Sequence, residues 1–352
     1  MSYGVKYIGS KASLIPFILQ TLDTIKEPIA TAIDVFTGTT RVAQALKKRG
    51  LKVTTSDLAW ASKVYSDTWI GNHGPTSHLQ ARIDTLNGLT GIDGWITTNY
   101  CDVLGDNNGI VRVWQPKNGK KADAIRDQIE AWYLSKQIQG WEANVLITSL
   151  ILALDKVDNT VGVQQAYLKE WCQRSHKDLL LELPPYIEGQ KGTHLTGDCL
   201  QLTYEPADIA YLDPPYSGHS YSTYYHIWDS IAFWDKPEVG LKTNRRVDRI
   251  SGHAEFDPHM NSLWNSKKSA LNAFEQLIDR LPVKYVLISY SDESLIEIDA
   301  LKKLLSKYKE VTPFSVDYKR NIMCQIGNAS KDATEDTVYK TENKEYIFLI
   351  KK

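Results

Sequence analysis

An α/β fold with a doubly wound, mostly parallel sheet is predicted by two features of this 352-residue chain. The first is a strand–turn–helix–strand unit near the N-terminus, which is a common opening of such sheets. The second is the return, after residue 195, of short apolar segments of strand length. The region between them lacks this alternation. We therefore expect a Rossmann-like sheet interrupted by a largely helical insertion.

The opening unit spans residues 31 to 55. Thr31–Phe36 is rich in apolar and β-branched residues and is predicted to form a buried strand. Thr37–Thr40 is a turn of small residues, and Arg41–Arg49 has the pattern of a helix that Gly50 would end. Leu51–Thr55 then predicts the second strand.

Three later segments are strand candidates: Asp208–Leu212, Lys284–Ser289 and Glu345–Ile350. Residues 61–194 contain turn-rich and tryptophan-rich segments followed by two helical runs. The simplest division is one α/β domain made of residues 1–60 and 195–352, with residues 61–194 as the insertion.

Composition narrows the class of protein. The chain is 42% hydrophobic and 24% charged, and no apolar run approaches the roughly 20 residues that span a bilayer. The N-terminus lacks a signal-peptide pattern, so we expect a cytoplasmic protein. The formal net charge of −1 gives no bulk attraction to polyphosphate, and any contact with nucleic acid must come from a local basic patch. The four cysteines show no metal-ligand spacing, so no metal site is expected.

The clearest chemical signal is Asp213-Pro214-Pro215-Tyr216, which follows the strand candidate ending at Leu212. Prolines cannot continue a sheet ladder, so they stiffen the chain at the strand end, where open α/β sheets bind ligands. The amino group of a planar base is a poor nucleophile, and Asp213 and the Pro214 carbonyl are candidate acceptors for its hydrogens. Tyr216 is a candidate to stack on a flipped base. The alternative is a proline-stiffened turn without chemistry.

A second signal, Asp34–Gly38, joins the first strand to the following helix. A turn of small residues lets backbone amides approach a ligand closely. The segment holds one glycine, so the Gly-x-Gly-x-x-Gly fingerprint is absent and an NAD enzyme is disfavoured. Asp57, at the end of the second strand, is a candidate acceptor for ribose hydroxyls. A solvated turn and a surface aspartate are the alternative interpretation.

The order of these segments resembles that of the DNA adenine-N6 methyltransferases of the Dam-like α group, the D12 class. Lys6–Lys11 is similar to the family's N-terminal element, and Thr196–Cys199 to the segment before its catalytic strand. The resemblance implies S-adenosylmethionine as the cofactor, no metal, Tyr7 packed on the cofactor, Lys11 paired with its carboxylate and Asp198 at its adenine amino group. Taken with the residue patterns above, the candidate cofactor residues are Tyr7, Lys11, Asp34, Phe36, Thr37, Gly38, Asp57, Asp198 and Cys199, and the candidate catalytic residues are Asp213, Pro214, Pro215 and Tyr216.

Further segments are similar to a narrower branch, the methyltransferases of type IIS restriction-modification systems of the FokI kind. These segments are Leu154–Thr160, Ala166–Lys169, Tyr224–His226 and Ala232–Pro237. This similarity implies a monomer that acts on an asymmetric site in double-stranded DNA, in a prokaryote or phage. It also implies a restriction endonuclease as a separate partner, and it makes residues 61–194 the expected region of target recognition.

The densest basic run is a candidate DNA contact. Lys242, Arg245, Arg246 and Arg249 lie within eight residues that show no helical apolar face, which suits a loop lying on phosphates. A solvated charge run is the alternative. Tyrosines and tryptophans between residues 221 and 228 follow helical spacing, so core packing is the better interpretation for most of them.

The predicted reaction is direct, in-line methyl transfer from S-adenosylmethionine to the N6 amino group of a flipped-out adenine. Methyl transfer to another amino group, in cytosine N4, RNA adenine or a protein glutamine, needs the same electrostatics and remains open. Asp213 favours adenine among these. A catalytically idle DNA-binding specificity module is the alternative from another class, and saturable cofactor binding discriminates the two.

Overall fold

The computed structural model describes most of the chain. The described residues are 2–7, 9–71, 73–101, 113–163, 168, 170–216, 218, 221–240, 244–250, 257, 262–292, 294–319 and 342–352. None of the helices among these residues combines the length and the apolar composition of a membrane span.

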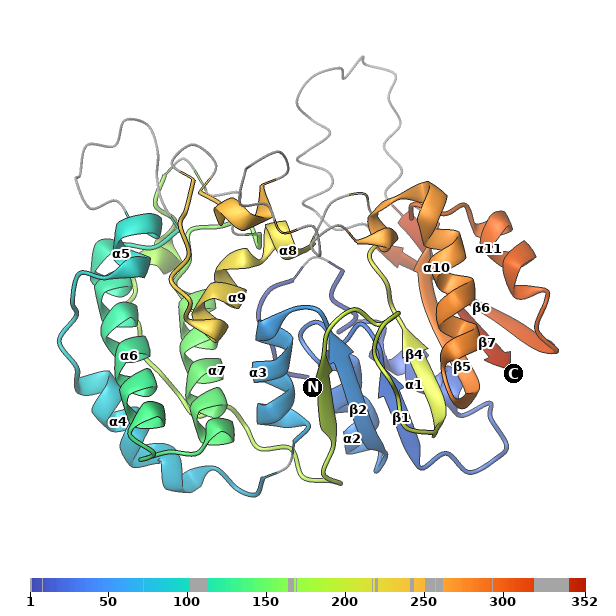
Figure 1. The fold of residues 1–352 in the computed structure, drawn as a ribbon, viewed down its shortest axis with the longest axis horizontal. Helices are drawn as coiled ribbons and strands as arrows, with labels where there is room; N and C mark the ends of the chain where they lie inside the picture. Colours follow the sequence, from blue (N-terminus) through green and yellow to red (C-terminus); the bar gives the residue numbers. More distant parts are fainter. Residues whose placement is uncertain are drawn as a thin grey trace, which may run out of the picture.

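A seven-stranded sheet lies at the centre of the described fold, in the order β3-β2-β1-β4-β5-β7-β6 (Figure 1). The first five strands in this order pair in parallel, and β7 pairs antiparallel with both β5 and β6. The strands are β1 (Thr31–Asp34), β2 (Lys52–Asp57), β3 (Thr193–Thr196), β4 (Ala207–Leu212), β5 (Val283–Ser291), β6 (Glu310–Lys319) and β7 (Glu342–Lys351). The predicted mostly parallel α/β sheet is confirmed.

Helices cover both faces of this sheet. Tyr285 and Leu287 of β5 belong to one buried apolar cluster, which also includes residues of α1 (Ile15–Leu22) and α2 (Arg41–Lys48). The intervening Val286 and Ile288 belong to a second cluster with α10 (Lys267–Arg280) and α11 (Ile298–Leu305). Alternate side chains of one strand therefore face two different helical layers, as a doubly wound sheet requires.

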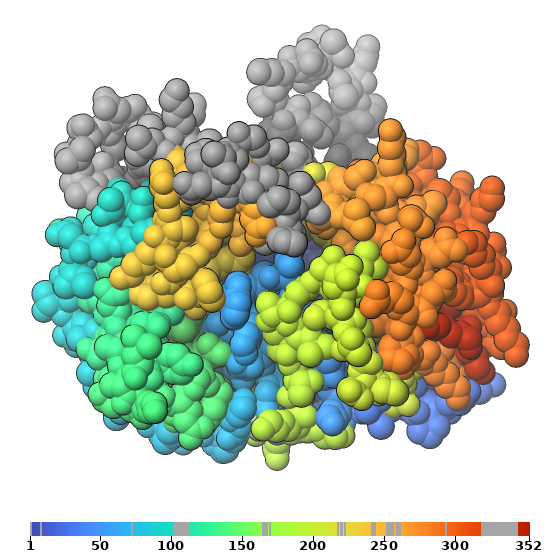
Figure 2. Space-filling model, viewed as in Figure 1, coloured from blue at the N-terminus to red at the C-terminus, as the bar shows by residue number. Residues whose placement is uncertain are grey.

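The described residues between β2 and β3 are largely helical, as predicted. Figure 2 shows this region on one side of the molecule and the C-terminal elements on the other. Its elements are α3 (Trp60–Trp69), η1 (Ser77–Leu79), α4 (Gln80–Gly88), α5 (Trp95–Tyr100), α6 (Pro116–Leu134), α7 (Gly140–Lys156) and η2 (Gln173–His176). β3 begins at Thr193, so the sheet resumes two residues before the boundary at 195, and the proposed division into domains stays a prediction.

The segment after β4 forms α8 (Tyr221–Tyr224) and α9 (His226–Phe233), followed by the short 3₁₀ helices η3 (Val247–Arg249) and η5 (Leu263–Asn265). Tyr225 and Trp228 are 7% and 3% exposed and join the larger apolar cluster. Core packing of these two aromatics is confirmed.

The carboxyl ends of β1, β2 and β4 lie side by side. β1 pairs with β2 on one edge and with β4 on the other, so the strand order reverses direction at β1. Ligands of doubly wound sheets bind at this switch point, outside the carboxyl ends of the strands. Asp34 ends β1, Asp57 ends β2 and Asp213 follows β4.

Candidate active site

A single pocket at the switch point brings together residues that are far apart in the sequence. It is lined by the N-terminal segment and by the chain that follows β1, β2, β3 and β4. The predicted residues that line it are Tyr7, Lys11, Asp34, Phe36, Thr37, Gly38, Asp57, Asp198, Cys199, Asp213, Pro214, Pro215 and Tyr216. The predicted cofactor residues and the predicted catalytic tetrad therefore share one cavity.

Asp213 is held where β4 ends. Its Oδ1 lies 3.0 Å from Nζ of Lys11, and the side chains of these two residues are only 17% and 5% exposed. Burial raises the pKa of the Asp213 carboxyl, and the ammonium group of Lys11 opposes that shift. The Lys11 Nζ also donates to the Gly9 carbonyl at 3.1 Å. The wall of the pocket thus holds a carboxylate whose negative charge is balanced by the ammonium group of Lys11.

Tyr216 is fixed at both of its ends. Its backbone carbonyl accepts from the amide of Leu295 at 2.8 Å, and its hydroxyl donates to Ser289 Oγ at 3.3 Å and to Glu345 Oε2 at 3.5 Å. Nζ of Lys11 lies 4.3 Å from the ring centroid, which is within the range of a cation–π contact. The ring of Tyr216 is thereby held in one orientation at the pocket.

Ser289 and Glu345 are site-supporting residues that the sequence did not point to as functional. Burial raises the pKa of Glu345 to about 7, with Lys11 opposing the shift and Asp213 adding to it. Glu345 is 7% exposed and lies in β7. The only sequence signal was an acidic residue at the start of the apolar strand candidate Glu345–Ile350, where a solvated strand end is the ordinary expectation.

The loop after β1 folds around two carboxylates. Asp34 Oδ2 accepts from Thr37 Oγ1 at 2.9 Å and from the Ala43 amide at 3.1 Å, and burial raises the pKa of this carboxyl to about 7. Its Oδ1 is buried without a hydrogen-bond partner among the described residues. Gly38, at φ +48°, donates its amide to Asp57 Oδ2 at 2.8 Å. The left-handed backbone explains glycine at this position.

Asp57 and Asp198 close the other side of the pocket. Asp57 Oδ1 accepts from the Ala59 amide at 2.9 Å, and burial raises its carboxyl pKa while backbone and side-chain hydrogen bonds oppose the shift. Asp198 Oδ1 accepts from the Leu200 amide at 3.0 Å. Cys199 is 7% exposed, and burial raises the pKa of its thiol.

Three tyrosine rings stack above the loop. The Tyr7 ring lies 4.3 Å from that of Tyr225 and 5.5 Å from that of Tyr221, centroid to centroid. A methyl group added at Gly38 would lie 3.9 Å from the Tyr7 ring, so Tyr7 covers the loop. Tyr221 and Tyr225 also line the pocket. The helical stripe after the tetrad therefore packs in the core and forms part of the pocket wall.

The predicted basic contact is only partly an exposed surface. Lys242 lies outside the described residues, and Arg245 is partly exposed. Arg246 is 6% exposed, with an ion pair of 2.5 Å to Asp235 and one of 2.9 Å to Asp248.

Arg249 lines the pocket beside Asp229, with 8% of its side chain exposed. Neighbouring carboxylates thus hold Arg246 and Arg249 inside the fold, whereas the sequence predicted an exposed loop lying on phosphates, with a solvated charge run as the alternative. DNA contact by this run stays a prediction.

Comparisons with a family model and with curated proteins both indicate DNA methyltransferases. The family model described as D12 class N6 adenine-specific DNA methyltransferase matches residues 7–304. The chain is 27% identical over 354 residues to the Type II methyltransferase M.NlaIII of Neisseria lactamica, and the alignment covers 99% of each chain.

Two other relatives are longer. The chain is 30% identical over 315 residues to the modification methylase StsI of Streptococcus sanguinis, which covers 86% of this chain and 46% of that one. It is 26% identical over 363 residues to the Type II methyltransferase M.FokI of Planomicrobium okeanokoites, which covers 99% of this chain and 53% of that one. The chain thus spans about half the length of these two relatives, and the expected likeness to the FokI kind is confirmed.

Proposed function

The chain belongs to the D12 class of N6 adenine-specific DNA methyltransferases, and on that basis we propose that it transfers a methyl group from S-adenosylmethionine to adenine N6 in double-stranded DNA. The observation that carries the proposal is the shared pocket. Asp213 to Tyr216 follow β4, the loop Asp34–Gly38 follows the adjacent β1, and both open into the same cavity. A methyl donor and a base amino group need this proximity for in-line transfer.

The residues present fit S-adenosylmethionine. Asp34 Oδ1 is a buried acceptor without a partner among the described residues, which suits the ammonium group of the methionine moiety. Lys11 supplies a buried cation for the carboxylate, and the carboxylates of Asp57 and Asp198 suit the ribose hydroxyls and the adenine amino group. Tyr7, Phe36, Thr37, Gly38 and Cys199 complete the proposed cofactor wall.

The proposed chemistry is carried by four residues after β4. S-adenosylmethionine, when bound, supplies a methyl group activated on a sulfonium. Asp213 and the Pro214 carbonyl accept hydrogen bonds from the adenine amino group, which raises the electron density on its nitrogen. Asp213 is also the acceptor for the proton that the amino group releases. Tyr216 stacks on the flipped base, and Pro215 stiffens the turn that holds these groups in place.

We further propose that the protein modifies DNA within a restriction-modification system, as a monomer beside a separate endonuclease. This role is supported by the similarity to M.NlaIII and M.FokI, which are type II methyltransferases, and to StsI, which is a modification methylase. In this proposal residues 1–60 and 195–352 carry catalysis, and residues 61–194 contribute to target recognition. Arg245, with Lys242, Arg246 and Arg249, is proposed to lie near the DNA backbone.

Mass spectrometry of nucleosides tests the proposal. Mixed-sequence duplex DNA is incubated with the protein and isotopically labelled S-adenosylmethionine, then digested. Labelled N6-methyladenine is the expected product. Labelled N4-methylcytosine would show that the substrate base is cytosine and not adenine. Absence of label in DNA, with label in a parallel incubation with RNA or protein, would reassign the substrate. Saturable cofactor binding without any transfer would favour an idle DNA-binding module.

A further inference from the structure

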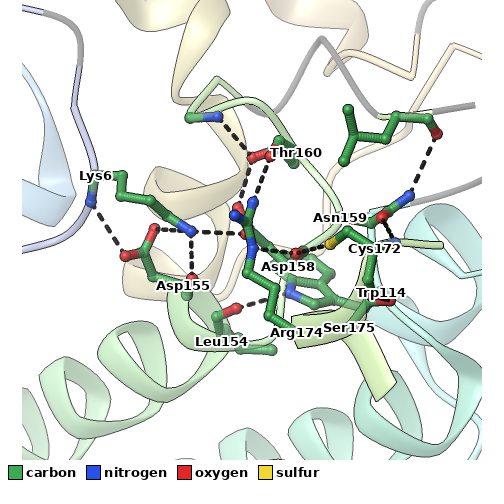
Figure 3. Close-up of polar contacts among 12 residues, drawn as sticks. Lys6, Trp114, Leu154, Asp155, Asp158, Asn159, Thr160, Cys172, Arg174 and Ser175 are labelled. Carbon is green, nitrogen blue, oxygen red and sulfur yellow. Dashed lines mark hydrogen bonds and ion pairs between the residues drawn. The ribbon is translucent and has the colours of Figure 1, made fainter. Parts of the chain in front are cut away.

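A charged cluster of Lys6, Asp155, Asp158 and Arg174 joins the N-terminal segment to the end of α7 (Figure 3). The backbone amide of Lys6 donates to Asp155 Oδ2 at 3.1 Å. Its Nζ donates to the Asp155 carbonyl at 2.7 Å and to Asp158 Oδ1 at 2.8 Å. Both the backbone amide and the side-chain ammonium group of Lys6 therefore donate hydrogen bonds to one short stretch of the helical region.

The acidic side of this cluster is rigidly built. Asp158, Asn159 and Thr160 are each 2% exposed or less. Nε of Arg174 donates to the Asp158 carbonyl at 2.8 Å and to its Oδ1 at 2.9 Å. The Asn159 side chain accepts from the Cys172 amide at 2.8 Å, as Figure 3 shows. The turn at Asp158–Thr160 is therefore fixed independently of Lys6.

The other side of the cluster leads directly to the pocket. Arg41 donates to the carbonyls of Gly4 and Val5 at 2.9 and 3.1 Å, which ties the preceding residues to α2. Lys6 is the last anchored residue before Tyr7, whose ring covers Gly38 and stacks on Tyr225. A backbone hydrogen bond at one residue restricts the direction of the next, so the attachment of Lys6 adds to the ring stacking and to the Ser10 amide bond that hold Tyr7 in place.

We infer that Lys6, with Asp155 and Asp158, forms a set of positioning residues that hold Tyr7 over the cofactor loop, so that the helical region sets the affinity for S-adenosylmethionine. The inference rests on the proposed function, because it assigns Tyr7 to the cofactor. A site held in place before binding avoids the entropic cost of ordering it at the moment of binding. None of these three residues lines the pocket, so they act through Tyr7.

The test compares Lys6→Met with Lys6→Arg and with Lys156→Met. Lys156 lies in the same helix as Asp155 and pairs with Glu182, but both side chains are mostly exposed, at 60% and 67%. Cofactor affinity is measured by calorimetry, DNA affinity by fluorescence anisotropy, and methylation at saturating cofactor by label transfer. Lys6 is 38% exposed, so its replacement is not expected to unfold the protein.

Lys6→Met should weaken cofactor binding by about tenfold or more, since it releases an anchor next to the ring that covers the ligand. DNA affinity and the rate at saturating cofactor should stay within about threefold of wild type. Lys6→Arg should recover most of the affinity, and Lys156→Met should match wild type. Asp155→Asn, which keeps the shape of the side chain, should repeat the Lys6→Met effect in weaker form.

Three results would overturn the inference. One is wild-type cofactor affinity in a folded Lys6→Met variant. A second is an equal loss of cofactor and DNA affinity that follows a fall in Tm, since this indicates a merely structural contact. The third is an equal effect of Lys156→Met. Failure of the wild-type protein to bind S-adenosylmethionine at all would instead reject the proposed function, and this inference with it.

Discussion

Nζ of Lys11 lies 3.0 Å from Oδ1 of Asp213 inside a pocket that shields both groups from water. Asp213 is the proposed acceptor for the base amino group, and Lys11 is the proposed partner of the cofactor carboxylate. One buried cation therefore stands between the two ligands that the pocket is proposed to hold. The ionisation of Asp213 therefore depends on Lys11.

Asp213→Asn should abolish methyl transfer, with a fall of at least about 10²-fold, because an amide at this position cannot accept the proton that the amino group releases. Cofactor affinity should change by no more than a few-fold. Label transfer to duplex DNA and calorimetric titration with S-adenosylmethionine measure the two quantities. Transfer at a near-normal rate by this variant would remove Asp213 from the mechanism.

Lys11→Met should shift the acidic limb of the activity profile to higher pH. Burial already raises the pKa of Asp213 and Lys11 opposes the shift, so loss of the ammonium group raises that pKa further. The ionised acceptor is then lost at a higher pH as the solution is acidified. The measurement is kcat/KM against pH for the wild type, Lys11→Met and Lys11→Arg, and coincident acidic limbs in all three proteins would contradict the coupling.

Glu345→Gln should stabilise the protein at alkaline pH and not at pH 4. Burial raises the pKa of Glu345 from its ordinary 4.5 to about 7. Between these two pH values the folded state keeps a proton that the unfolded chain has released. The contribution of Glu345 to stability is thus fully present below pH 4.5 and decreases as pH rises to 7. The difference in free energy of unfolding should reach at most about 3 kcal/mol at pH 8. Denaturant titrations at pH 4 and 8, with the exposed Glu310→Gln as control, measure it.

Arg245→Ala and Arg246→Ala should separate DNA contact from stability. Arg246 is buried and paired with Asp235 and Asp248, so its loss leaves two acids without their partner and should cost about 3 kcal/mol of stability. Arg245 is partly exposed, so its loss should weaken DNA binding and lower the salt dependence of the affinity by about one unit of slope. Thermal unfolding and anisotropy titrations at several salt concentrations measure both. An unchanged salt slope in Arg245→Ala would remove it from the DNA contact.

Much of the sheet could be predicted because its buried strands are apolar and bounded by turn residues. The segments proposed for β1, β2, β4, β5 and β7 all form strands, and Gly50 follows α2 at φ +94° as expected of a helix end. β3 was missed, since Thr193–Thr196 carries three polar residues and lies at the edge of the sheet. β6 was missed for a related reason, because Pro313 and several polar residues mask a strand that also lies at an edge.

The site could be predicted where a short motif specifies it and not where packing does. Asp213–Tyr216 and Asp34–Gly38 are contiguous, so their order along the chain was informative, and one pocket holds both. Ser289 and Glu345 reach Tyr216 only because β5, β7 and the chain after β4 are neighbours in space. The burial of Arg246 depends on Asp235, which a pattern of positive charges does not reveal.

The position of β1 between β2 and β4 also constrains how the chain acquires its shape. The amide of Thr31, at the start of β1, donates to Asp208, near the start of β4, at a sequence separation of 177. Contacts of such long sequence separation close large loops and slow the search for the native topology. During translation β1 and β2 emerge together, but the pocket cannot form until β4 has left the ribosome. The pair of β1 and β2 therefore has both outer edges unpaired until β3 and β4 arrive, and refolding limited by this late pairing is the expected consequence of the strand order.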